Sequence, residues 1–275
     1  MSEQDVVAHT GASWVREIAN FALAACKPLF WHDRSVRWPK DVHGGSCFVL
    51  RFGNTIIGVT AAHVVQQYEA ARAQTLALVC QLGNIEFDLA AAMIDRDDDL
   101  DIATFSVTSD QLKRLNGLAF DCTGAWPPPT PDRTRAISLV GCPEQTRIIR
   151  SDLGADFAAY GALGAVDDIN DRDILVTYDP SRDQMMVSAV PVPPLGFNMS
   201  GCSGGPAIIH GERAGLHRWY PVGMILRGPG SFTSGDAAAF DMIRVRRIHF
   251  VRTDGTIDPP SSGWLPPRPY IDPTV

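Results

Sequence analysis

One segment of the chain carries a serine in a setting that suits nucleophilic catalysis. Ser203 lies among small residues in the run Ser200-Gly201-Cys202-Ser203-Gly204-Gly205-Pro206. A serine hydroxyl is a weak nucleophile, so it needs a base within hydrogen-bond reach and donors aimed at the developing oxyanion. Because a turn of small residues lets backbone N–H groups point into a site, we expect those of Gly201 and Ser203 to form an oxyanion hole.

Two further segments offer a base and a carboxylate that would orient it. His63 follows a β-rich run and a Thr-Ala-Ala step, where small neighbours leave room for an imidazole at an interface. Asp101 begins an apolar run, so we expect its side chain at the edge of the core. A carboxylate that accepts from one ring nitrogen fixes the tautomer and stabilises the imidazolium. Asp99 is the alternative to Asp101 in this role.

Length and composition favour a turn-rich globular protein. The 275 residues are 45% hydrophobic and 20% charged, and they include 24 Gly and 20 Pro. Such a length fits two domains, or one all-β double barrel. The net charge of −7 argues against nucleic-acid and anionic membrane partners, because these need a basic face. We recognise no transmembrane run and no signal peptide, and therefore expect a cytoplasmic protein.

The cysteines and the acidic residues give no metal motif. We interpret the six cysteines as free thiols, because they are widely spread and show no CxxC pair. No Cys/His spacing indicates zinc, and we expect neither a metal nor another cofactor. The acidic cluster from Asp95 to Asp101 has Leu100 and Ser106 where an EF-hand loop needs Gly and Glu. We interpret the cluster as a solvated loop, and a weaker calcium loop is the alternative.

Hydrophobic periodicity predicts one helix followed by two β-rich halves. The spacing of Trp14, Ile18, Phe21 and Ala25 predicts an amphipathic helix over 12–31, and a short helix is predicted over 61–72. The segment over 237–250 fits either a helix or a strand. Short β-rich runs predict strands over Ser46–Arg51, Asn54–Thr60, Leu76–Leu82, Ile85–Ala91, Ile102–Val107, Ala136–Gly141, Phe157–Val166, Ile174–Tyr178, Met185–Val190, Ala207–His210 and Val222–Leu226.

In the order His63, Asp101, Ser203, the three segments resemble those of trypsin-like (chymotrypsin-fold) serine peptidases. These segments are more similar to those of bacterial, HtrA-like members of the family. We recognise no PDZ-like segment after them. The resemblance covers about residues 44 to 250 and implies an all-β fold of two six-stranded antiparallel barrels, with the active site between them. The matching runs are Gly45–Val49, Thr60–His63, Asp101–Ala103, Gly201–Pro206 and Val222–Ile225.

The resemblance and the Pro-rich run Trp126–Pro131 together predict the organisation of the chain, because proline removes ladder donors and stiffens a linker. We expect a helical N-terminal extension over 1–40, a first barrel over 41–122, the linker over 123–134, a second barrel with a closing element over 135–255, and a Pro-rich tail over 256–275.

The resemblance also implies a substrate cleft. It places Phe197 where the family selects the substrate side chain, and Leu226 and Gly228 along the cleft. Phe197 offers no carboxylate to a basic side chain, so we expect cleavage after small or medium apolar residues. Cys202 stands where many secreted members have an activating aspartate, and the site is therefore expected to be preformed or ordered by a partner. We interpret Cys202 as a buried spacer, with a nucleophile or a redox-sensitive neighbour as alternatives.

The sequence thus predicts a serine endopeptidase that acts on protein or peptide substrates. In this role Ser203 attacks the scissile carbonyl, His63 is the general base and then the general acid, and Asp101 orients His63. Two alternatives stay open. One is a catalytically silent binding or regulatory module. The other is a peptidase gated by an activating protein partner, which would bind the N-terminal helix or the Pro-rich tail.

Overall fold

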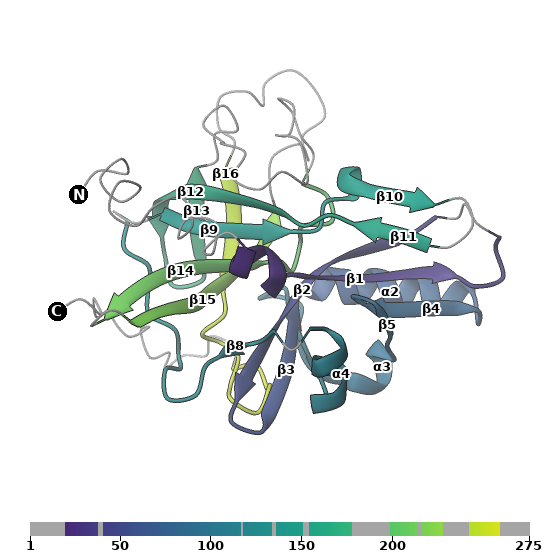
Figure 1. The fold of residues 1–275 in the computed structure, drawn as a ribbon, viewed down its shortest axis with the longest axis horizontal. Coiled ribbons are helices and arrows are strands. Elements are labelled where there is room, and N and C mark those ends of the chain that lie inside the picture. The colour runs from purple at the N-terminus through teal and green to yellow at the C-terminus, as the bar shows by residue number, and fades with distance from the viewer. Residues whose placement is uncertain are drawn as a thin grey trace, which may run out of the picture.

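The computed structural model describes residues 20–37, 41–116, 118–133, 136–150, 154–177, 199–213, 216–227 and 242–258. Most of the strands form an N-terminal sheet and a C-terminal barrel, which lie beside each other in Figure 1. In this part of the chain no helix is long and apolar enough to cross a membrane.

The N-terminal sheet has eight strands. Seven follow the order β5-β4-β1-β2-β3-β7-β6, and β8 pairs with β2. The strand β2 is bonded on both sides, and its central residues form one buried run, as expected for a strand covered on both faces. The elements are β1 (Lys27–Asp33), β2 (His43–Phe52), β3 (Thr55–Thr60), α2 (Ala62–Gln74), β4 (Leu78–Leu82), β5 (Ile85–Glu86), α3 (Leu89–Ala92), β6 (Met93–Asp97), β7 (Ile102–Ser106), α4 (Ser109–Arg114) and β8 (Phe120–Asp121).

The strands β2 and β3, which correspond to the predicted strands over Ser46–Arg51 and Asn54–Thr60, form a hairpin. Phe52 pairs with Thr55, and Gly53 in the turn has a φ of +62°, a conformation that favours glycine. Farther along β3, a Cβ atom added at Gly58 would lie 2.0 Å from Cε2 of Phe105, so only glycine allows β7 to approach this closely. The helix α2 begins at Ala62, directly after the hairpin.

The C-terminal half forms a closed six-stranded barrel in the order β12-β13-β16-β15-β14-β9. Along β12, buried and exposed residues alternate, because one face of the strand lies in the barrel core. The elements are β9 (Ala136–Gly141), the 3-10 turn η1 (Glu144–Thr146), β10 (Arg147–Arg150), β11 (Gly154–Phe157), β12 (Tyr160–Ile169), β13 (Asp173–Thr177), β14 (Pro206–Arg213), β15 (Leu216–Arg227) and β16 (Met242–Arg247). The strands β10 and β11 form a separate two-stranded ribbon.

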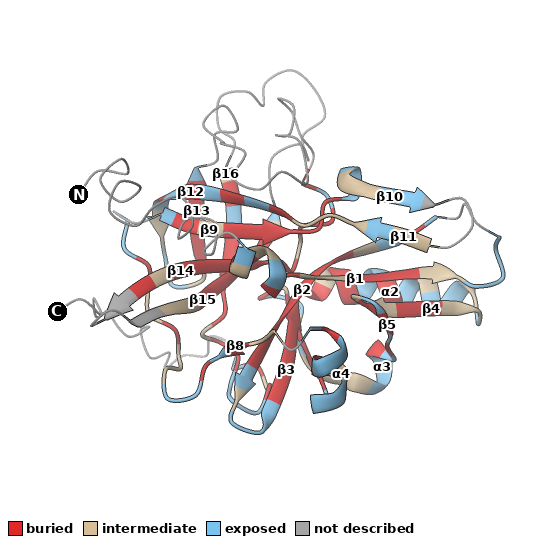
Figure 2. Cartoon of the chain, viewed as in Figure 1, coloured by how far each residue is buried: buried red, intermediate tan, exposed pale blue. Residues whose placement is uncertain are grey.

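The two halves share one hydrophobic core. Val140, Ile208 and Met224 come from barrel strands, but they are buried in the same cluster as the N-terminal sheet. Residues of the opposite barrel face, such as Ile137 and Leu139, form the second cluster inside the barrel. Figure 2 shows this burial in red along β2, β9 and β16. The position of one half is therefore fixed by packing against the other.

The chain returns to the N-terminal half after β16. The indole N–H of Trp126 donates to the carbonyl oxygen of Val251 at 2.7 Å, and the Thr104 hydroxyl donates to that of Gly255 at 2.6 Å. The segment over 248–257 therefore packs on the N-terminal half, although the sequence predicts residues 135–255 as the second barrel with its closing element and 256–275 as the tail.

The structure confirms a mostly β fold and one closed barrel. In the N-terminal half, the pairings among the described residues give eight strands rather than six, and they do not close the sheet. Compared with the strands predicted from the sequence, β1, β6 and the short parallel strand β8 are additional. The double barrel stays a prediction.

The helix predicted over 12–31 is wrong in its C-terminal part. Residues 20–25 are helical, but the chain from Lys27 to Asp33 forms β1, which pairs with both β2 and β4. Pro28 lacks the N–H that a helix would use, and pairing on both sides satisfies the backbone of this segment instead. The first sheet thus begins at Lys27, inside the extension that the sequence predicted over 1–40.

Three other segments differ from the sequence prediction, were left undecided by it, or lie outside the described residues. The strand expected over Ile85–Ala91 ends at Glu86, because Asp88 caps α3 by accepting a hydrogen bond from Ala91 N at 3.1 Å. The segment left undecided over 237–250 contains the strand β16. The strand expected over Met185–Val190 lies outside the described residues.

All six cysteines are buried, free thiols, as the sequence predicted. The sulfur atoms of Cys26 and Cys142 lie 3.9 Å apart. The hydrogen bond with Cys142 and burial together raise the pKa of the Cys26 thiol well above its usual value. The Cys26 thiol is therefore protonated at neutral pH and contributes to packing.

His249 gives a prediction for the pH dependence of stability. Burial, with a smaller contribution from Arg247, lowers the pKa of His249 to about 3 in the folded chain. In the unfolded chain this pKa returns to about 6.5, so the unfolded state binds the proton first. The stabilisation is complete above about pH 6.5 and is lost as the pH falls toward 3.

We expect the wild type to lose roughly 1 to 2 kcal/mol more unfolding free energy than His249→Gln when the pH falls from about 7 to about 5. Urea unfolding of both proteins at the two pH values measures this difference. Equal losses in the two proteins would contradict the burial of a neutral imidazole.

Candidate active site

His63 lies in the first turn of α2, directly after β3. Ala61 is the N-cap residue and makes no side-chain cap, so the first N–H groups of the helix need other acceptors. The backbone N–H of His63 donates to Oδ1 of Asp101 at 2.9 Å. The positive end of the helix dipole also favours a carboxylate at this place. Asp101 therefore acts as the missing cap of α2.

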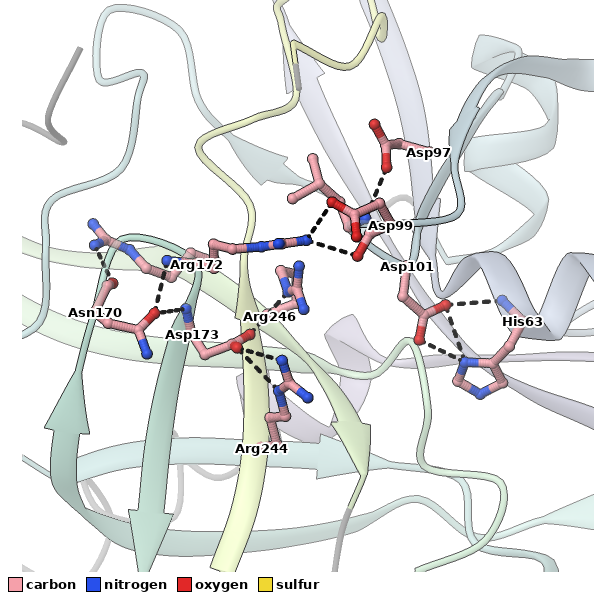
Figure 3. Close-up of polar contacts among 11 residues, drawn as sticks. His63, Asp97, Asp99, Asp101, Asn170, Arg172, Asp173, Arg244 and Arg246 are labelled. Atoms are coloured by element: carbon pink, nitrogen blue, oxygen red, sulfur yellow. Dashed lines mark hydrogen bonds and ion pairs between the residues drawn. The ribbon is translucent and has the colours of Figure 1, made fainter. Parts of the chain in front are cut away.

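The same carboxylate holds the His63 ring (Figure 3). His63 Nδ1 lies 2.8 Å from Asp101 Oδ2 and 3.1 Å from Oδ1. Because a carboxylate accepts hydrogen bonds, Nδ1 is the donor and Nε2 of the neutral ring is left as the acceptor. The two side chains are 34% and 26% exposed. The imidazole is thus held with Nε2 as the free acceptor, and its side chain is partly exposed.

The structure separates the two aspartates between which the sequence left a choice. Asp101 has a φ of +56°, in the left-handed region that few residues other than glycine adopt, and its carboxylate meets His63. The carboxylate of Asp99 pairs instead with Nη2 of Arg172 at 2.8 Å. This arrangement favours Asp101 as the orienting carboxylate.

The other acidic residues of this cluster have structural contacts. Asp95 and Asp97 belong to β6, rather than to the solvated loop that the sequence predicted. Oδ2 of Asp95 accepts from Ile257 N at 2.8 Å, and Oδ1 of Asp97 accepts from Leu100 N at 2.7 Å. Among the described residues, no group of three or more His, Cys, Asp or Glu side chains is placed to hold a metal ion.

The predicted nucleophile lies in a tight turn before β14. Gly205 N donates to the carbonyl oxygen of Cys202 at 2.9 Å, and Gly201 and Gly204 have φ values of +91° and +86°, which favour glycine. Within the described part of the chain, the N–H groups of Gly201 and Ser203 donate no hydrogen bond. These two N–H groups are therefore available as the donors that the predicted oxyanion hole needs.

The Ser203 hydroxyl has a partner in the barrel. It donates to the carbonyl oxygen of Leu226, in β15, at 3.0 Å. The hydrogen bonds among the described residues include none between Ser203 and His63. Catalytic hydrogen bonds are often long in unliganded sites and tighten when substrate binds. In this structure the Ser203 hydroxyl is therefore bonded to the Leu226 carbonyl oxygen and not to the His63 ring.

Gly45 brings the nucleophile turn close to the helix that carries the base. A Cβ atom added at this position would lie 2.7 Å from Cγ2 of Val64 and 3.0 Å from the carbonyl oxygen of Ser203. Val64 follows His63 directly in α2. The turn that carries the serine and the turn that carries the imidazole are thus packed on the same glycine, at the junction of the two halves.

Ser46, in β2, bridges the two halves through a buried hydroxyl. Its Oγ donates to the carbonyl oxygen of Gly201 at 2.7 Å and accepts from Cys142 N at 2.8 Å. Its own N–H donates to the carbonyl oxygen of Ser203 at 2.8 Å. The sequence patterns did not assign this role to Ser46. The signal was a lone serine in the otherwise apolar buried run Gly45–Leu50, because a buried hydroxyl needs hydrogen-bond partners.

Cys202 belongs to the turn that carries Ser203 and is completely buried. A Cβ atom added at Gly141 would lie 2.6 Å from its sulfur atom. Burial, with a contribution from Cys142, raises the pKa of the Cys202 thiol well above its usual value, so the thiol is a poor nucleophile. These observations favour the buried spacer over the nucleophile.

Of the three residues predicted to line a substrate cleft, the structure describes Leu226. Phe197 and Gly228 lie outside the described residues. A groove of about 600 Å³ lies between β1, the turn after β4 and β11, where Phe30 and Phe157 contribute to its walls. None of the predicted catalytic residues lines this groove.

No protein-family model and no curated protein matches the chain. Among solved structures, it is similar to a thermostable serine protease, AL20, from an extremophilic microorganism, at 11% identity and a TM-score of 0.40, over 82% of this chain and 92% of that one. It is also similar to the HtrA-type protease AlgW with a tripeptide, at 13% identity and a TM-score of 0.38, over 85% of this chain and 59% of that one. Because these identities and TM-scores are low, the site is assigned from the contacts described above and not from these similarities.

The Ser46 bridge predicts a loss of stability when its hydroxyl is removed. Ser46→Ala leaves the carbonyl oxygen of Gly201 and the N–H of Cys142 without this partner in a buried place. We expect the unfolding free energy in urea to fall by about 1 to 3 kcal/mol. The matched control is Ser106→Ala, because the exposed Ser106 hydroxyl also donates to a backbone carbonyl. An equal, small change in both variants would contradict the role of the bridge.

Proposed function

We propose that the chain is a serine endopeptidase of the trypsin-like, HtrA-like type, which hydrolyses peptide bonds in protein or peptide substrates. The observation that carries this proposal is the packing of the Ser203 turn and the His63 helix on Gly45, with Asp101 bonded to His63 Nδ1. The proposed reaction needs acid–base and nucleophilic groups, and the chain supplies them without a cofactor.

In this mechanism Ser203 Oγ attacks the scissile carbonyl carbon, and its proton passes to His63 Nε2. The negative charge that develops on the carbonyl oxygen accepts hydrogen bonds from the N–H groups of Gly201 and Ser203. The C–N bond then breaks, and His63 returns the proton to the leaving amine. Water attacks the acyl-enzyme with His63 again as the base, which releases the acid and restores Ser203. Asp101 stabilises the imidazolium in both steps.

The hydrogen bond from Ser203 to Leu226 favours a second candidate, a peptidase-like module that is silent or is gated by a partner. While this bond is made, the hydroxyl proton faces the Leu226 carbonyl oxygen rather than the base. Binding of a substrate or an activating protein would have to favour the other rotamer. The two candidates differ in whether the free chain reacts with an active-site probe.

For the substrate side chain, we propose small or medium apolar residues. The support is the sequence position of Phe197, which provides no carboxylate to pair with a basic side chain. Cleavage of a peptide library, read by mass spectrometry, tests this preference. Cleavage mainly after Arg or Lys would contradict it.

The reaction with a fluorophosphonate probe tests the proposed function. We expect one covalent addition to the wild type, mapped to Ser203 by peptide mass, and none to Ser203→Ala. Turnover of an unstructured protein substrate should fall by about 10⁶-fold in the same variant. Cys202→Ala is the matched control and should still react, because its thiol is buried.

Reaction of Ser203→Ala at the wild-type rate would contradict the assignment of the nucleophile. A wild type that neither reacts nor cleaves would favour the silent or gated module.

A further inference from the structure

The turn between β12 and β13 contacts the turn that carries Asp101. Nη2 of Arg172 donates to the carbonyl oxygen of Asp99 at 2.7 Å and to its carboxylate at 2.8 Å, as Figure 3 shows. Arg172 belongs to the barrel, whereas Asp99 belongs to the N-terminal half. A single guanidinium nitrogen thus links the barrel to the backbone two residues before the carboxylate that orients His63.

The backbone that leads to Asp101 requires such support. Asp101 adopts a φ of +56°, and a residue other than glycine keeps a left-handed conformation where its surroundings determine it. On one side of the turn, the side chain of Asp97 accepts a hydrogen bond from Leu100 N, and Leu100 itself is completely buried. On the other side, Arg172 holds the carbonyl oxygen of Asp99.

Arg172 projects from a turn that is itself well held. Oδ1 of Asn170 accepts from the backbone N–H of Arg172 at 2.9 Å and from that of Asp173 at 2.8 Å. Asp173 is buried between two arginines, with Nη2 of Arg244 at 2.6 Å and Nε of Arg246 at 2.9 Å. These contacts hold the backbone at the base of the Arg172 side chain.

We propose that Arg172 is a positioning residue, which holds the Asp99 backbone so that Asp101 stays in the conformation that bonds to His63. The effect on reaction rate rests on the proposed function, whereas the effect on the hydrogen bond between His63 and Asp101 does not. Arg172 touches neither the substrate nor the reacting atoms. Its action passes through Asp99 to Asp101, and it ties the geometry of the triad to the fold of the barrel.

The bond to the Asp99 carbonyl oxygen has the larger effect in this account. The Asp99 side chain is 78% exposed, and such surface ion pairs contribute little. Asp99→Ala removes the ion pair but leaves the carbonyl oxygen in place for Arg172. We therefore expect Asp99→Ala to change the site less than Arg172→Ala, which removes both bonds. An ordinary surface ion pair would give equal effects.

The test uses the full chain and two readouts. The first is the rate constant for reaction of Ser203 with a fluorophosphonate, and the second is the far-downfield proton resonance of the His63 Nδ1–H group. We expect Arg172→Ala to slow the reaction about fivefold, which corresponds to an activation free energy raised by roughly 1 kcal/mol. The same variant should weaken or broaden the resonance. Arg172→Lys should restore part of the rate, because both bonds start from one nitrogen.

The matched control is Arg133→Ala. Arg133 pairs with Asp168 on the barrel surface, and Asp168 lies in β12, the strand that leads to the Arg172 turn. We expect this variant to react at the wild-type rate, with a change in unfolding free energy similar to that of Arg172→Ala. A merely structural role for Arg172 would give both variants the same rate. If Arg172→Ala does not fold, Arg172→Gln replaces it.

The outcomes separate this inference from the proposed function. A wild-type rate and an unchanged resonance in Arg172→Ala would overturn the inference, as would an equal slowing in Arg133→Ala. If the wild type does not react with the probe, the proposed function fails and the resonance alone decides. Loss of the resonance in Arg172→Ala, with the resonance present in Arg133→Ala, would still support the positioning of Asp101 by Arg172. A resonance present in both variants would overturn this inference.

Discussion

The buried hydroxyl of Ser46 is the contact on which the geometry of the site depends. It belongs to the N-terminal sheet, but its partners are Gly201 and Cys142 from the other half of the chain. A buried carbonyl or N–H group that loses its hydrogen-bond partner destabilises the folded state by about 1 to 3 kcal/mol. A shift of one half relative to the other would break these hydrogen bonds and is therefore unfavourable. The shared core around Val140 and Met224 opposes the same movement.

On the other side of the junction, one carboxylate serves both a helix and an imidazole. Asp101 accepts from the backbone N–H and from the ring of His63, so the base cannot turn without loss of a helix cap. The carboxylate is itself held from the barrel through Arg172 and Asp99. Two connections between the halves therefore determine the site. One is the bond from Ser46 to the turn that carries Ser203, and the other is the bond from Arg172 to the turn that carries Asp101. Each half positions a group that belongs to the other.

Local patterns predicted the parts of this arrangement that depend on local structure. The hairpin of β2 and β3, the helix after it and most barrel strands followed from period and turn residues. The three candidate site residues were proposed from their neighbours in sequence and from the family resemblance, and their catalytic roles stay a prediction. Pairing between distant segments was not visible. The segment from Lys27 to Asp33 has helical spacing before it, yet it forms a strand because β2 and β4 flank it. Ser46 and Arg172 gained their roles in the same way, from partners 155 and 73 residues away.

A crystal structure of the fluorophosphonate adduct tests the central claim, which is that the contact between the halves assembles a working nucleophile and oxyanion hole. The account predicts a bond from Ser203 Oγ to phosphorus, with the phosphonyl oxygen accepting from the N–H groups of Gly201 and Ser203. The bond from Ser46 Oγ to the Gly201 carbonyl oxygen should persist. A phosphonyl oxygen that points away from both N–H groups, or a turn that leaves Ser46 on reaction, would contradict the account.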